Sequence, residues 1–73
     1  MRFNSVLASK YRKNGYLFIE SVAGVGYYDI NIQHPNGMAT WIDTFTNKGT
    51  AIKEAKQRAM EQKLGFNPDT DII

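Results

Sequence analysis

The residue types most often used in catalysis are sparse in this chain of 73 residues. His34 is its only histidine and there is no cysteine, so a zinc site or a catalytic triad has too few side chains to draw on. Asp29 and Asp43 could form an acid–base pair if they lie opposite each other on neighbouring strands, although two solvated surface acids are the commoner arrangement. Gly24-Val25-Gly26 lacks the third glycine and the following helix of a dinucleotide-binding loop, which predicts a hairpin turn. We therefore expect no enzyme activity, no metal and no cofactor.

Cations that could bind phosphate are concentrated near the start of the chain. Residues 1–15 contain four basic side chains and no acidic one, a charge of +4. Residues 16–64 are neutral overall, and Asp69 and Asp71 bring the net charge to +2. A basic balance favours an anionic partner, although a few lysines also simply keep a small protein in solution. The candidate nucleic-acid-binding residues are Arg2, Lys10, Arg12, Lys13 and Lys48.

The elements that must position these residues are expected to form one small domain over residues 1–73. A chain this short buries only about 60% of the surface that its unfolded form exposes, so its core must be thin. Its composition, 42% hydrophobic and 22% charged, is ordinary for a globular protein and argues against disorder. No apolar run approaches the roughly 18 residues of a membrane span, and no signal-peptide pattern is visible. We expect a cytoplasmic protein.

Aromatic and β-branched residues in the first two thirds of the chain predict a three-stranded antiparallel sheet over residues 16–45. His34-Pro35-Asn36-Gly37 has the composition of a tight turn between the second and third strands. The predicted strands are residues 16–23, 27–33 and 38–45.

One long C-terminal helix is predicted over residues 48–64. Asn47 is a good N-cap, and Gly65 followed by Pro68 is a good stop. Before the sheet, a basic N-terminal segment (residues 1–14) has the spacing of a short helix over residues 5–13. After the long helix, we expect residues 66–73 to be a loose tail.

The resulting fold class is α+β, with the long helix packed on one face of the sheet. Apolar residues at a period of two in the strands and of 3.6 in the helix predict which side chains meet. The predicted core residues are Ile30, Ile32, Ile42, Ala55 and Ala59.

One helix cannot cover both faces of a sheet, so we expect function on the other face. Asp43 suggests that its own side of the third strand faces solvent, which would expose Trp41. The alternative is a flipped strand in which Trp41 is the largest core residue. The candidate protein-binding residues are Tyr16, Phe18, Glu20, Tyr27, Asp29, Trp41 and Asp43.

Residues 26–65 carry a Pro/Gly turn, then Trp41-Ile42-Asp43-Thr44-Phe45, a capping Asn47, an alanine-rich helix and Gly65. This order resembles the plant APETALA2-type DNA-binding domain and the related arm-binding domain of phage and transposon integrases. The resemblance implies a three-stranded sheet that enters the DNA major groove, with Trp41 meeting the DNA. The family's strand arginines, which read guanines, are absent here, and the strands carry acids in their place.

Two looser resemblances cover the same region. Lys53-Glu54-Ala55-Lys56 resembles the second helix of double-stranded-RNA-binding domains, and the order of strands and helix also resembles HicB-type antitoxins.

Two functions follow from the sequence. The first is a small non-enzymatic protein-binding module, such as a bacteriophage accessory protein that binds and inhibits a host enzyme, for example the transcription machinery. The alternative is a nucleic-acid-binding module of the APETALA2 or integrase-arm type. The acidic strands favour the first function, whereas the basic N-terminal segment and the resemblance favour the second.

Overall fold

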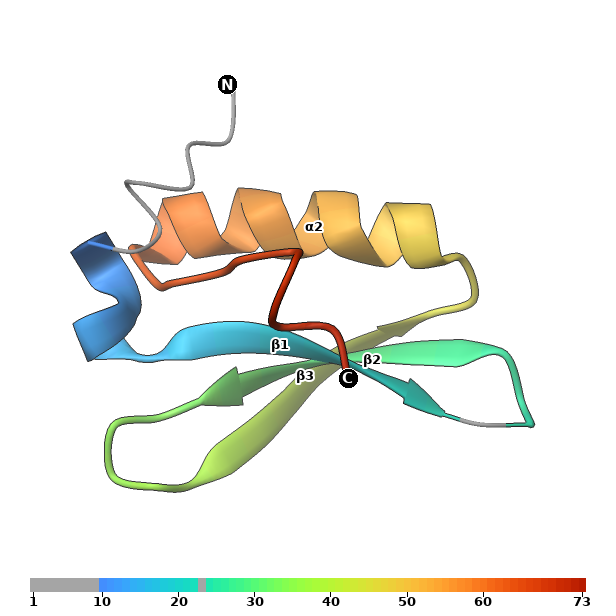
Figure 1. The fold of residues 1–73 in the computed structure, drawn as a ribbon, viewed down its shortest axis with the longest axis horizontal. Coiled ribbons are helices and arrows are strands. Elements are labelled where there is room, and N and C mark those ends of the chain that lie inside the picture. Colours follow the sequence, from blue (N-terminus) through green and yellow to red (C-terminus); the bar gives the residue numbers. More distant parts are fainter. Residues whose placement is uncertain (1–9, 23) are drawn as a thin grey trace.

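The computed structural model describes residues 10–22 and 24–73. A short 3-10 helix, η1 (Arg12–Asn14), leads into three strands and one long helix (Figure 1). The strands are β1 (Tyr16–Val22), β2 (Tyr27–Gln33) and β3 (Ala39–Phe45), and the helix is α2 (Lys48–Gln62).

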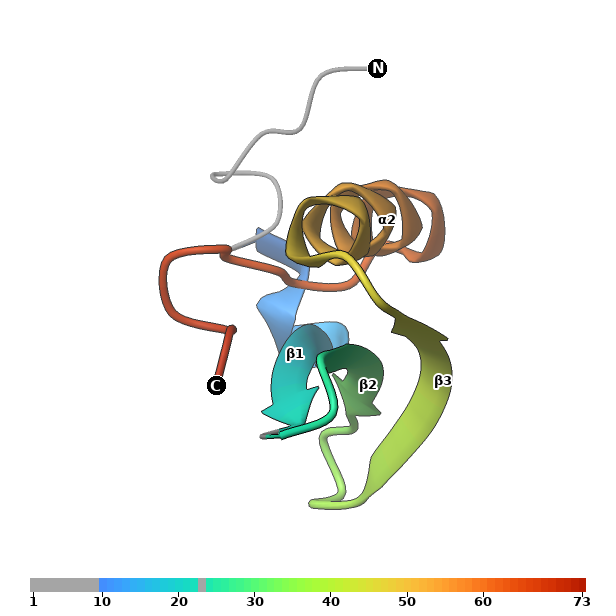
Figure 2. The same cartoon turned by 90° about the vertical axis from the view of Figure 1, so that its right-hand side faces the viewer.

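The three strands form one antiparallel sheet in the order β1-β2-β3, and α2 lies across one face of it (Figure 2). This is the α+β fold that the sequence predicts. The turn between β2 and β3 is closed by the His34 N–H, which donates to the Met38 carbonyl at 2.8 Å. Gly37 adopts a φ of 92° in this turn, a backbone conformation that glycine tolerates without steric cost.

The core lies between the sheet and α2. Leu17, Ile19 and Ile30 are fully buried against a stripe of small residues, Ala51, Ala55 and Ala59, on the helix. Small side chains at this spacing let the helix approach the sheet closely. Of the predicted core residues, Ile30, Ala55 and Ala59 are buried, and Ile32 and Ile42 are partly buried against the same cluster. The predicted core is therefore confirmed.

The predicted N-cap of α2 is confirmed, whereas the helix ends earlier than predicted. The Asn47 side chain accepts a hydrogen bond from the Thr50 N–H at 3.0 Å, as expected of an N-cap. The helix ends at Gln62 rather than at residue 64, because Lys63 already adopts a left-handed φ of 56°. Gly65 serves close packing instead: a Cβ at this position would lie 2.9 Å from the Cα of Arg12.

Residues 66–73 are not the loose tail that the sequence suggests. Together with Gly65 they form a C-terminal segment (residues 65–73) that pairs in parallel with the outer edge of β1 (Figure 1). The Leu17 N–H donates to the Gly65 carbonyl at 2.8 Å, and the Ile19 N–H donates to the Asp71 carbonyl at 2.7 Å. Phe66 is 1% exposed and belongs to the core. The segment therefore completes the core and covers an edge strand.

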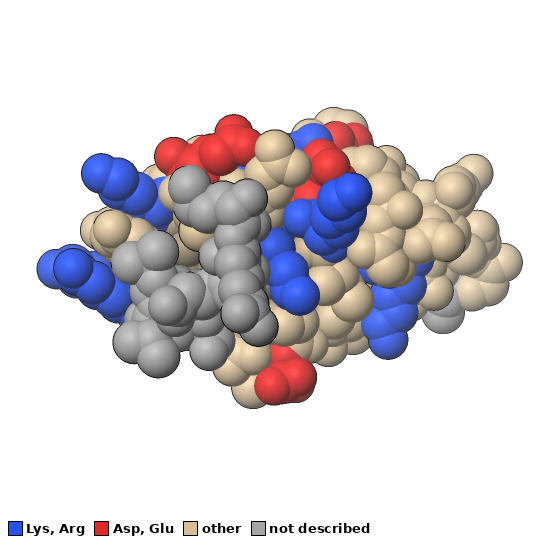
Figure 3. Space-filling model, turned by 90° about the horizontal axis from the view of Figure 1, so that it is seen from above, with Lys and Arg blue, Asp and Glu red and all other residues tan. Residues whose placement is uncertain are grey.

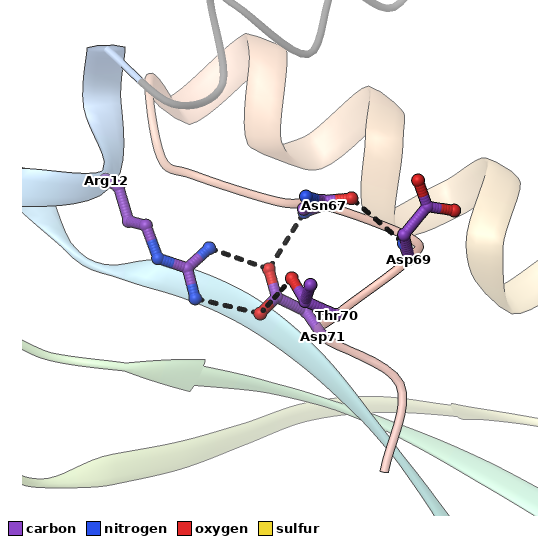
Figure 4. A network of polar contacts seen from close by, with 5 residues as sticks. All are labelled: Arg12, Asn67, Asp69, Thr70 and Asp71. Carbon is purple, nitrogen blue, oxygen red and sulfur yellow. Dashed lines mark hydrogen bonds and ion pairs between the residues drawn. The ribbon is translucent and has the colours of Figure 1, made fainter.

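A buried carboxylate fastens the C-terminal segment to η1. Asp71 is 4% exposed, and the Arg12 guanidinium donates to its two oxygens at 2.8 Å each (Figure 4). The Asn67 N–H donates to the same carboxylate at 2.8 Å. A bidentate pair of this kind holds both chain segments in one geometry. Donating these hydrogen bonds to Asp71 also raises the pKa of Arg12.

The predicted helix over residues 5–13 falls partly outside the described residues, which begin at Lys10. Within the described part, Lys10 and Tyr11 are α-helical, and η1 follows them directly before β1 begins. No helix among residues 10–22 and 24–73 is long and apolar enough to cross a membrane.

Candidate functional site

The candidate site is the sheet face that points away from α2, called the open face below (Figure 2). Because side chains alternate along a strand, the burial of Leu17, Ile19 and Ile30 toward the helix sends their neighbours the other way. The open face consists of Tyr16, Phe18, Glu20 and Val22 on β1, Tyr27, Asp29, Asn31 and Gln33 on β2, and Ala39, Trp41 and Thr44 on β3.

The strand register arranges these side chains in rows across the sheet. Phe18, Asn31 and Trp41 lie opposite one another and form an aromatic row with a polar centre. Glu20, Asp29 and Thr44 form the next row. On the other side of the aromatic row, Tyr16 pairs with Gln33.

Trp41 is exposed, as the sequence suggests, but the reason given from Asp43 is wrong. The register places Trp41 opposite Asn31 and Asp43 opposite Ile30, which leaves Ile42 as the extra residue of a β-bulge. Ile42 and Asp43 therefore both point toward the helix side, where Ile42 packs on the core. Asp43 does not belong to the open face.

Asp43 instead joins β3 to α2. The Arg58 guanidinium donates to its carboxylate at 2.7 Å and lies 3.6 Å from Glu54 one helical turn away. The bond from Arg58, followed by one from the Thr44 N–H, lowers the pKa of Asp43. Asp43 is therefore a structural ion-pair partner rather than a binding residue.

Trp41 is held in place although it is not buried. Trp41 is 59% exposed, and its indole N–H donates to the Thr44 hydroxyl at 2.9 Å. The same hydroxyl donates to an Asp29 carboxylate oxygen at 2.6 Å. The bulge makes this chain of bonds possible, because it brings Trp41 and Thr44 to the same face three residues apart. The only tryptophan of the chain is thus fixed and open to contact.

The acids of the open face have no cationic partner among the described residues. Glu20 and Asp29 lie directly opposite each other on β1 and β2. None of the three strands contains a lysine or arginine. The acid–base pair considered for Asp29 and Asp43 does not form, because Asp29 faces Thr44 on the open face and Asp43 lies on the helix side.

The predicted nucleic-acid-binding residues do not gather into one patch. Arg2 lies outside the described residues. Arg12 is ion-paired with Asp71, and its guanidinium carbon lies 3.9 Å from the centre of the Tyr16 ring. Lys10 precedes η1, Lys13 lies within it, and Lys48 begins α2, and all three are exposed. Because η1 lies near the end of α2 (Figure 1), the first two are separated from Lys48 by the length of the helix.

The helix side of the molecule carries both positively and negatively charged side chains. Lys and Arg are interspersed with Asp and Glu when the structure is viewed from above α2 (Figure 3). Such mixing is typical of a solvated helix face rather than of a phosphate-binding stripe. The Glu54–Arg58 pair on α2, whose members are four residues apart, contributes to this mixing.

Thr44 and Asn31 belong to the site but were not among its predicted residues. Thr44 links Trp41 to Asp29, and Asn31 occupies the centre of the aromatic row. In strict alternation, Thr44 falls on the side of the third strand opposite Trp41. Only the bulge at Ile42 reverses that assignment, and nothing in the local composition marks a bulge there.

No family model, no curated protein and no solved structure matches this chain. The resemblance to the APETALA2-type and integrase-arm domains therefore stays a prediction. The structure agrees with it in placing a tryptophan on the open face, and differs from what DNA reading needs in presenting Glu20 and Asp29 there.

Proposed function

We propose that this protein is a non-enzymatic binding module that attaches to another protein through the open face of its sheet. The single observation that carries the proposal is Trp41, which is 59% exposed and yet fixed by the hydrogen bond to Thr44. An exposed ring held in one orientation loses little further freedom on binding. Tryptophan is also the residue type that most often dominates the energy of an interface.

The neighbours of Trp41 support a contact surface rather than a reactive centre. The Thr44 hydroxyl donates to the Asp29 carboxylate and accepts from the indole, so both groups hold the ring. Phe18 completes the row on the far side of Asn31. The result is a surface that combines aromatic and polar side chains, as protein interfaces do.

The charges favour a protein over a nucleic acid as the partner. A phosphate backbone would meet Glu20 and Asp29 on the open face and no strand lysine or arginine. The cation of Arg12 is already paired with Asp71. We propose a role of the kind that a small bacteriophage protein has when it binds and modulates a host enzyme such as the transcription machinery.

The test compares capture by wild type with capture by two variants. Tagged protein is incubated with bacterial lysate, with and without nuclease treatment, and retained proteins are identified by mass spectrometry. Trp41→Ala should lose the specifically retained protein, because truncating an interface hot spot costs about 2 kcal/mol or more of binding. Met38→Ala is the matched control, since Met38 is 66% exposed but lies in the turn before β3 and outside the open face.

Two results would count against the proposal. Equal retention by wild type and Trp41→Ala, with both variants folded by circular dichroism, would remove the open face as the binding surface. Retention that disappears with nuclease would favour the nucleic-acid alternative, and Lys10→Ala with Lys13→Ala would then test its basic residues. Deleting residues 1–13 is unsuitable for that purpose, because it would strip Arg12 from the buried Asp71.

A further inference from the structure

We propose that the partner docks a basic segment on the open face, with an arginine side chain placed against Glu20 and Asp29. This inference rests on the proposed function and names the chemistry of its partner. It is carried by charge complementarity: within residues 10–22 and 24–73 no cation pairs with the acids of the open face, and aromatic side chains lie beside them.

Glu20 and Asp29 form a cross-strand pair of like charge. They are direct partners in the register of β1 and β2, and like charges in that position destabilise a sheet. Thr44 hydrogen-bonds to one oxygen of Asp29, and no ion pair to Glu20 or Asp29 occurs within residues 10–22 and 24–73. The folded chain therefore keeps a repulsion that an external cation would relieve.

Three other acids of the described chain are ion-paired, whereas Glu61 and Asp69, which lie outside the open face, have no ion pair within it. Asp71 is paired with Arg12, and Asp43 and Glu54 are both paired with Arg58. Both arginines of the described residues are thus used on the helix side or at the edge of β1. The strands of the open face thus carry acidic side chains and no basic one, and the Arg12 guanidinium stacks on Tyr16 at the edge of β1 while it is paired with Asp71.

The row next to the acids has the groups that favour a guanidinium over a plain ammonium. Trp41 and Phe18 stand one row away, and adjacent rows on one face of a sheet are about 7 Å apart. Arginine stacks on aromatic faces and also makes bidentate bonds to carboxylates. An extended segment that alternates arginine with apolar residues matches this spacing, because its same-side residues also repeat at about 7 Å.

The probe is an acetylated and amidated peptide, Arg-Val-Arg-Val-Arg-Val-Arg, with versions in which glutamate or lysine replaces arginine. Binding is followed by the fluorescence of Trp41, since the probes contain no aromatic residue. The arginine peptide should give a saturable change, the lysine peptide a weaker one, and the glutamate peptide none.

The decisive variant combines Glu20→Gln with Asp29→Asn, which keeps an acceptor for the Thr44 hydroxyl. Its dissociation constant for the arginine peptide should rise about tenfold or more, because two charge-assisted contacts are lost. The control combines Glu61→Gln with Asp69→Asn, which removes the same charge from exposed positions outside the open face. The control should bind as wild type does, and circular dichroism confirms that both variants are folded.

Three outcomes separate this inference from the proposed function. Equal weakening in the two double variants would mean that only net charge matters, and the inference would fail. A captured protein that is lost by Trp41→Ala but kept by the Glu20→Gln, Asp29→Asn variant would leave the binding face standing and overturn the basic partner. A captured protein kept by both would overturn the proposed function as well.

Discussion

Replacing Thr44 by valine would free Trp41 without removing it. Valine has nearly the shape of threonine but neither donates nor accepts a hydrogen bond. The substitution therefore breaks the bond from the Trp41 indole at 2.9 Å and the bond to Asp29 at 2.6 Å together. Thr44→Ser is the matched control, because serine keeps the hydroxyl that both bonds need.

The expected loss of stability is small. A protein hydrogen bond contributes a net ~0.5–1.5 kcal/mol, and here the groups left behind reach water. Trp41 is exposed and Asp29 is only partly buried, so neither is left as an unsatisfied buried group. Valine also suits a strand well. We expect Thr44→Val to lower the free energy of unfolding by about 1 kcal/mol, the sum of two such bonds at the low end of that range.

The expected loss of binding comes from disorder of the ring. Fixing a free side chain at an interface costs ~0.5–1.5 kcal/mol, which is roughly a two- to tenfold increase in the dissociation constant. The direct assay is NMR, because the single tryptophan gives one indole N–H resonance. In wild type and Thr44→Ser this proton should be shifted downfield and exchange slowly with water. In Thr44→Val it should move toward the free-indole position and exchange faster.

An indole resonance that is unchanged in Thr44→Val would refute the reasoning. It would mean that the ring is held by packing against neighbours rather than by the hydroxyl of Thr44. Unchanged capture of the partner by Thr44→Val, together with a shifted resonance, would show that fixing the ring does not matter for binding.

Three further perturbations test the rest of the structure. Phe66→Ala should cost about 3–5 kcal/mol of stability in urea unfolding, because it removes a large side chain from the core. An unfolding midpoint equal to that of wild type would mean that residues 66–73 are a loose tail, as the sequence suggests. Glu20→Gln should raise the melting temperature, since relieving ~0.2–1 kcal/mol of cross-strand repulsion shifts a domain of this size by several degrees; a lower melting temperature would contradict the like-charge pair. The pKa of Asp43 is lower in the folded protein than in the unfolded chain. Its pair with Arg58 therefore stabilises the fold at pH values above the unfolded pKa, and this stabilisation is lost as the pH falls through the folded pKa. Asp43→Asn should flatten that acid limb of the stability curve, and an unchanged limb would rule out the pair as its source.

Several features of the protein follow from the sequence because they depend on neighbouring residues. The alternation of Tyr28, Ile30 and Ile32 marks the buried side of β2 at a period of two. The stripe of Ala51, Ala55 and Ala59 marks the buried side of α2 at a helical period. These two periods are enough to predict an α+β fold with a helix on one face of a sheet.

The candidate site was only partly predictable. The exposure of Trp41 was expected, but on the argument that Asp43 shares its face, which the bulge at Ile42 contradicts. A bulge inserts one residue and moves every later side chain to the other face. It thereby placed Asp43 beside Arg58 and brought Thr44 next to Trp41.

The C-terminal segment was decided by the tertiary structure alone. Residues 66–73 contain two aspartates and a proline, and locally they resemble a solvated tail. Asp71 is buried because Arg12, 59 positions away in the chain, donates to both of its oxygens. Phe66 is buried because pairing with the edge of β1 brings it under the helix. Local periodicity determines which elements form and which faces they bury, whereas a bulge or an ion pair depends on a partner that only the folded chain brings near.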